Sequence, residues 1–181
     1  MTDVPKPIDP ADLDDVSLDR DDERWTLVMI RRLRHAPDRV WSALVDPAQL
    51  AEWAPFDAPR DLSTTGPVIL TMATPDGTAG DALASEVLEV EAPVRLVYRW
   101  GDDLLRWDLA PDGDTRGTIL TLHHTIDDPE WVAQTAAGWH LCLDVAERSL
   151  DGGSGGRIVG EAAMDHGWEA LRDGYADRLA R

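Results

Sequence analysis

The sequence predicts an α+β domain in which an antiparallel sheet is followed by a long helix. Three observations predict it. A strand-like segment and two short helical segments precede residues 61–126, where apolar and polar residues alternate. Short turn sequences divide that alternating region, which is typical of an antiparallel meander. From about residue 129 to 151, the apolar residues then return at helical spacing.

The composition limits the class of protein. The chain has 181 residues, of which 43% are hydrophobic, so we expect one structured domain. The net charge of −18 argues against nucleic acid or an anionic membrane as a partner, because both need clustered basic residues. The single cysteine excludes an internal disulfide, and no signal peptide or membrane-spanning run is visible. We therefore expect a cytoplasmic protein.

The N-terminal third predicts a tail, a strand and two helices. Residues 1–23 carry nine acidic residues and three prolines, and we expect a disordered tail there. The β-forming residues of 24–34 predict a strand. In 35–56, Pro37 suits the first turn of a helix, and Asp46-Pro47 suits the N-cap and first position of a second one.

Five further segments predict the meander. Every second residue of a strand points to the same face of the sheet, and on two neighbouring strands these residues are apolar or aromatic. They are Leu96, Tyr98 and Trp100 on one strand and Leu105 and Trp107 on the next. One face of the sheet is therefore expected to be apolar and the other solvated. The predicted strands are 67–73, 82–91, 94–100, 104–110 and 117–126.

The long helix carries His140 and Cys142, the only cysteine, two residues apart. At about 100° per residue they point to opposite sides, so they cannot share a metal or act as nucleophile and base. We expect Cys142 to fill the apolar stripe that contains Trp139 and Leu143, and His140 to lie on the solvent side.

The C-terminal segment predicts a flexible connector and one more helix. The glycine-rich end of the long helix bounds the domain at 24–153, and 154–181 follow as linker and helix. An apolar stripe within 161–180 must pack on the domain or on a second subunit, and we favour a homodimer. The stripe consists of Met164, Trp168, Leu171, Tyr175 and Leu179.

Four stretches together resemble a known superfamily. They are APDRVWSALVDPAQLAEW (36–53), VLEVEAPVRLVYRW (87–100), LAPDGDTRGTILTLHHTI (109–126) and GWHLCLDVAERSLDGG (138–153). The chain resembles the START-like (SRPBCC) superfamily with its helix-grip fold, in the branch of homologues of the activator of the 90-kDa heat-shock-protein ATPase (AHSA-type). The resemblance implies a curved sheet of six or seven strands around the long helix, with an apolar cavity between them.

The alternation of side chains along each strand predicts which polar groups face this cavity. His124, Glu86 and Tyr98 are the inward candidates, able to contact a ligand, to transfer protons or to satisfy one another. No cluster has the spacing of metal ligands, and we expect no metal and no cofactor. The expected ligand-binding residues are Trp53, Tyr98, Trp100, Trp107, Leu122, His124, Trp139 and Leu143.

The family's members differ in activity, so three functions remain open. The first is binding of a small hydrophobic or aromatic molecule in the cavity. The second is an aromatase/cyclase-like or hydrolase-like enzyme that uses the inward polar residues. The third is a co-chaperone-like protein-interaction module.

Overall fold

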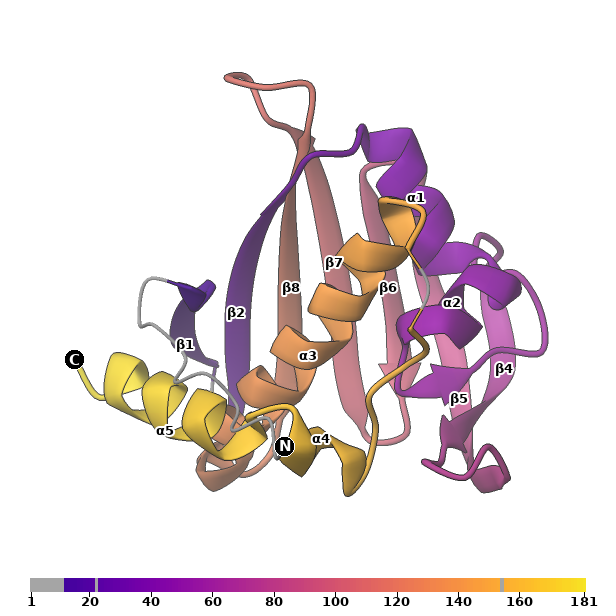
Figure 1. The fold of residues 1–181 in the computed structure, drawn as a ribbon. Helices are drawn as coiled ribbons and strands as arrows, with labels where there is room; N and C mark the ends of the chain where they lie inside the picture. Colours follow the sequence, from indigo (N-terminus) through magenta and orange to yellow (C-terminus); the bar gives the residue numbers. More distant parts are fainter. Residues whose placement is uncertain (1–11, 22, 154) are drawn as a thin grey trace.

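The computed structural model describes residues 12–21, 23–153 and 155–181, and Figure 1 shows one antiparallel sheet with helices on one of its faces. The strand order is β1-β2-β8-β7-β6-β5-β4-β3. The strands are β1 (Asp15–Asp21), β2 (Arg24–Leu33), β3 (Phe56–Asp57), β4 (Gly66–Ala73), β5 (Ala79–Glu91), β6 (Arg95–Trp100), β7 (Asp103–Pro111) and β8 (Thr118–Ile126). The α+β helix-grip prediction is confirmed, with eight strands among the described residues instead of six or seven.

The first two helices begin where the sequence predicted. Pro37 occupies the first turn of α1 (Pro37–Val45), and the Asp46 carboxylate accepts from the backbone N–H of Gln49 at 2.9 Å to cap α2 (Pro47–Trp53). A 3-10 turn, η2 (Pro129–Trp131), leads into the long helix α3 (Val132–Leu150). Figure 1 shows α3 lying across the sheet. The remaining helices are α4 (Ala162–Asp165) and α5 (Trp168–Leu179).

The core lies between the sheet and α3. Leu96 pairs with Trp107 across β6 and β7, and Trp107 pairs with Leu122 across β7 and β8. All three side chains are at most 1% exposed. The predicted apolar face of the meander is therefore the face that packs against the long helix.

The predicted disorder of residues 1–23 is wrong for Asp15–Asp21, which form the edge strand β1 on β2. Its alternation puts Val16 and Leu18 partly against the core, while the intervening residues are exposed. This short alternation lies within an acidic segment whose composition is otherwise typical of disorder. Residues 1–11 and 22 lie outside the described part of the chain.

The predicted inward orientation of Glu86 is wrong. The pairing of β5 with β6 shifts register between Val87 and Glu89, which is the signature of a β-bulge. A bulge adds one residue to the strand, so the residues on its two sides do not follow one alternation of inward and outward side chains. Val87 is therefore 1% exposed, whereas Leu88 is 39% exposed. Glu86, next to Val87, faces solvent.

The predicted solvent exposure of His140 is also wrong, because α5 covers that side of α3. Leu171 and Tyr175 of α5 are buried against the domain, and His140 is 7% exposed. The sequence predicted a single helix over 161–180, but the structure has two, α4 and α5. Gly167 separates them, because its φ of 79° is not helical. Leu171 and Tyr175 of the apolar stripe are covered within the chain, and the homodimer stays a prediction.

Among the described residues, no helix combines the length and the apolar character needed to span a bilayer.

Candidate functional site

A cleft of about 770 Å³ opens between the end of the sheet, α3 and the chain around α4. Most of the surface that lines it is apolar. The sheet supplies residues from the ends of β4, β6 and β8 and the start of β7, while the C-terminal segment closes the opposite side. The lining residues are Pro55, Met72, Ala73, Trp100, Asp103, His124, Thr135, Gly138, Trp139, Leu141, Cys142, Ile158, Val159, Gly160, Glu161, Ala163, Met164 and Trp168.

His124 on β8 joins the sheet to the helix at the floor of this cleft. The indole N–H of Trp139 donates to His124 Nδ1 at 2.9 Å, and His124 Nε2 lies 2.9 Å from Asp103 Oδ2. Because an indole nitrogen can only donate, Nδ1 must be the acceptor, and the ring proton sits on Nε2. His124 therefore donates to the Asp103 carboxylate, and both ring nitrogens are engaged.

Tryptophans form the aromatic wall beside His124. The rings of Trp100 and Trp139 lie 5.8 Å apart, and Trp139 packs edge-on against Trp107 at 5.4 Å. Such edge-to-face contacts stabilise aromatic clusters beyond simple area burial. Trp100 Nε1 is buried and has no hydrogen-bond partner among the described residues. The rings of Trp100, Trp107 and Trp139 therefore form one contiguous aromatic cluster beside His124.

The structure places the predicted ligand-binding residues in two groups. Trp100, His124 and Trp139 line the cleft. The other five are buried in the core and do not line it, namely Trp53, Tyr98, Trp107, Leu122 and Leu143. Tyr98 illustrates this second group: its hydroxyl accepts from Trp107 Nε1 at 3.2 Å, and burial raises its pKa well above the ordinary value. Glu86, the third polar candidate, faces solvent and belongs to neither group.

The C-terminal wall was not predicted to be part of the site. Ile158 and Val159 are buried, and Arg157 anchors this segment by donating to the Ala54 carbonyl and the Asp57 carboxylate. Met164 and Trp168 belong to the apolar stripe that the sequence predicts to pack on the domain or on a second subunit. An amphipathic stripe shows that a face must be covered, but it does not distinguish a packed face from a cleft wall.

Cys142 and His140 have separate surroundings, as the helical geometry predicted. Cys142 lines the cleft, and burial raises the pKa of its thiol to about 12. His140 instead faces Tyr175 and the Asp14 carboxylate on another side of α3. In the described ranges, no group of three or more His, Cys, Asp and Glu side chains could hold a metal ion.

An antiparallel sheet that grips one long helix beside an apolar cleft defines a helix-grip domain. The model of the family described as activator of Hsp90 ATPase homolog 1-like protein matches residues 34–150. The chain belongs to this family, which confirms the resemblance drawn from its sequence. The comparison with curated proteins gave no match.

Solved structures share the fold. CalU16 from Micromonospora echinospora superposes with a TM-score of 0.67 at 17% identity, covering 93% of this chain and 98% of that one. The AHSA1-like protein from Aeromonas hydrophila gives 0.59 at 24% identity, covering 70% and 92%. DynU16, described as a putative protein in the dynemicin biosynthetic locus, gives 0.59 at 27% identity. That match covers 72% of this chain and 48% of DynU16.

Proposed function

We propose that the protein binds a small hydrophobic or aromatic molecule in the cleft. The observation that carries this proposal is the cleft itself, about 770 Å³ of largely apolar space with Trp100, Trp139 and Trp168 in its walls. Pockets for small molecules usually measure about 300–1,000 Å³ and are lined by apolar and aromatic side chains around a few polar groups. Here His124 and Asp103 are the polar groups at the floor.

The hydrogen bonds of His124 favour binding over proton transfer. A general base needs a free lone pair within reach of the substrate. The Nδ1 lone pair of His124 already accepts from Trp139, and Nε2 carries the proton that Asp103 accepts. The ring is therefore held as a fixed part of the cleft floor. The presence of a similar protein in a biosynthetic locus also supports a small-molecule ligand.

Binding can be tested with N-phenyl-1-naphthylamine, an uncharged aromatic probe whose fluorescence rises in apolar surroundings. We expect saturable binding of one probe per chain, seen as energy transfer from tryptophan and as a single adduct in native mass spectrometry. Trp139→Phe should weaken binding, because it releases His124 and alters the wall.

Trp131→Phe is the matched control, since Trp131 is 61% exposed and does not line the cleft. It should leave the dissociation constant unchanged. Absence of saturable binding, or equal weakening by both variants, would contradict the proposal.

A second candidate function is an enzyme of the aromatase/cyclase-like or hydrolase-like class. The contact between the Asp103 carboxylate and His124 inside a cleft is the observation that favours it. In that case His124→Gln should abolish turnover of a bound polyketide-like compound while the compound still binds. Unchanged turnover by this variant would exclude His124 as the proton-transfer group.

A further inference from the structure

The charged side chains that line the cleft are all acidic. Among its described lining residues, the charged side chains are those of Asp103 and Glu161, and lysine and arginine do not occur. The two carboxylates stand beside the tryptophans of the wall. A ligand that enters the cleft therefore meets aromatic faces and negative charge together.

Three arginines close to residues of the cleft wall are each paired with a carboxylate outside the cleft. Arg24 lies 3.9 Å from Asp103 but makes its closer ion pair, at 2.7 Å, with Asp127. Arg157 pairs with Asp57 at 2.5 Å, and Arg172 pairs with Asp173 at 2.7 Å. These cations are largely compensated by partners outside the cleft, so they offer little attraction to an anionic ligand.

The negative charge at the cleft is not cancelled by His124. Since Nδ1 accepts from Trp139, the ring donates to Asp103 as a neutral hydrogen-bond donor and forms no ion pair there. The Glu161 side chain, at the rim, makes no hydrogen bond or ion pair with the described residues. The net charge of −18 adds a long-range field of the same sign.

We infer that the ligand of this cleft is an aromatic or apolar molecule that carries a protonated amine. This inference rests on the proposed binding function and specifies its ligand class. An ammonium group can approach the Asp103 carboxylate while the apolar body packs on Trp100 and Trp139, and cations are also attracted to tryptophan faces. The Arg172 guanidinium already stacks on Trp168 at 5.4 Å, which is an example of this contact at the cleft wall. A carboxylate ligand would instead be repelled.

Three ligands with one ring system and different heads test the inference by isothermal titration calorimetry. They are 1-naphthylmethylamine, 1-naphthalenemethanol and 1-naphthaleneacetate, which carry a positive, a neutral and a negative group. We expect the amine to bind about tenfold more tightly than the alcohol, the order of one charge contact in a partly desolvated site, and the acetate to bind most weakly.

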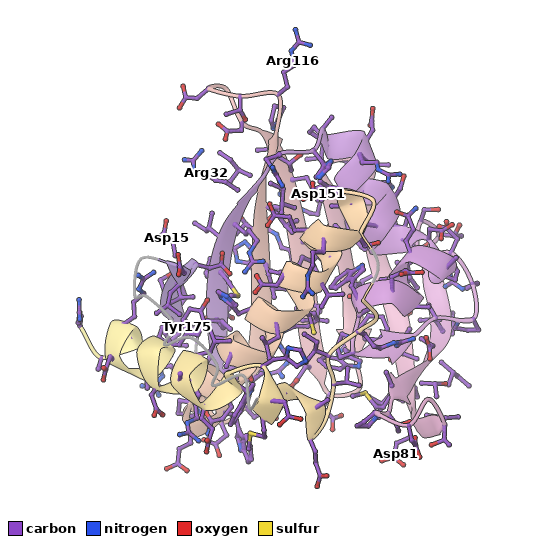
Figure 2. All side chains as sticks on the ribbon, in the orientation of Figure 1. Asp15, Arg32, Asp81, Arg116, Asp151 and Tyr175 are labelled. Carbon is purple, nitrogen blue, oxygen red and sulfur yellow. The ribbon has the colours of Figure 1, made fainter. Side chains whose placement is uncertain are left out.

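Two variants locate the source of the preference. Asp103→Asn keeps an acceptor for His124 Nε2 but removes the charge, and it should bring the amine and the alcohol to within about threefold of each other. Glu161→Gln removes an exposed, unpaired carboxylate and should fold normally, with a smaller loss of preference. Asp114→Asn is the control, because it deletes one negative charge from the β7–β8 turn. Arg116, in the same turn, lies far from α4 in Figure 2.

The outcomes separate the two proposals. Equal binding of the three ligands, tightest binding of the acetate, or a preference that Asp103→Asn and Glu161→Gln both leave intact would overturn the inference, while ligand binding itself would stand. If neither the naphthalene ligands nor N-phenyl-1-naphthylamine binds, the proposed function fails as well. Loss of the preference in Asp114→Asn would show that it comes from net charge and not from the cleft.

Discussion

The hydroxyl of Tyr175 on α5 lies 2.7 Å from Nδ1 of His140 on α3. The same hydroxyl accepts from the backbone N–H of Asp14 at 3.1 Å. One phenol thus joins the N-terminal segment, the long helix and the C-terminal helix. Tyr175 is labelled in Figure 2. These three parts of the chain are distant in sequence, so their packing should depend on this group.

Tyr175→Phe should lower the free energy of unfolding by about 2 kcal/mol, because it leaves a buried imidazole nitrogen and a backbone N–H without their partner. Urea denaturation followed by circular dichroism measures the change. Trp131→Phe serves as the control, since it alters an exposed ring. A Tyr175→Phe variant as stable as the parent would show that the hydroxyl contributes nothing to the packing of α5.

Asp14 should make the stability of the protein depend on pH in the acid range. Its burial opposes ionisation, but hydrogen bonds from His140 and Arg31 outweigh burial and hold its pKa below the ordinary value of 3.8. The ionised carboxylate therefore stabilises the fold above about pH 4, and that contribution is lost as the pH falls through the folded-state pKa.

Asp14→Asn tests this dependence. It breaks a buried ion pair with Arg31 (N···O 2.7 Å) and should cost about 3 kcal/mol at pH 7. The difference from the parent should shrink below pH 4, as measured by urea denaturation across the pH range. Asp15→Asn, at the neighbouring exposed position, should change stability by less than about 0.5 kcal/mol. A constant difference at every pH would contradict the role assigned to Asp14.

Local sequence signals predicted most of the architecture. The Asp46-Pro47 pair located a helix start because capping and proline geometry act within one turn. Alternation on β6 to β8 located the buried face because each strand in that region keeps its register. The same alternation identified Trp100 and His124 as candidates, while helical periodicity identified Trp139 on α3.

The errors arose where distant contacts decide the outcome. The bulge at Val87 changed the orientation of Glu86 without a glycine or proline to mark it. His140 is buried because α5 packs over it, and nothing in the sequence of α3 itself indicates that another helix packs there. The sequence analysis did not select Asp103 as a site residue, because the predicted strand begins at residue 104, whereas Asp103 is the first residue of β7 and contacts His124.

Cys142 should react slowly with thiol reagents although it lines the cleft. Burial raises its pKa from 9.0 to about 12, so the thiolate fraction at pH 8 falls by about a thousandfold. The rate of modification by 5,5′-dithiobis(2-nitrobenzoate) should increase about tenfold per pH unit between pH 8 and 10. The urea-unfolded chain provides the reference rate. A native rate that levels off near pH 9 would contradict the burial argument.

Gly160 should control the position of the C-terminal wall. Its φ is +58°, and a Cβ atom there would lie 2.8 Å from Cγ of Pro75, in the turn before β5. Gly160→Ala therefore combines left-handed backbone strain, about 1 kcal/mol, with a clash against a rigid ring. We expect the wall at Ile158 to Glu161 to shift and the affinity for N-phenyl-1-naphthylamine to fall.

Gly156 offers the matched control for that substitution. Its φ is +68°, and nothing lies within 4 Å of the position a Cβ would take. Gly156→Ala should therefore show only the backbone cost of about 1 kcal/mol in urea denaturation and bind the probe like the parent. If both variants lose the same stability and bind equally well, the contact between Gly160 and Pro75 does not set the shape of the cleft. A loss of affinity confined to Gly160→Ala would establish this close contact as the point that fixes the wall.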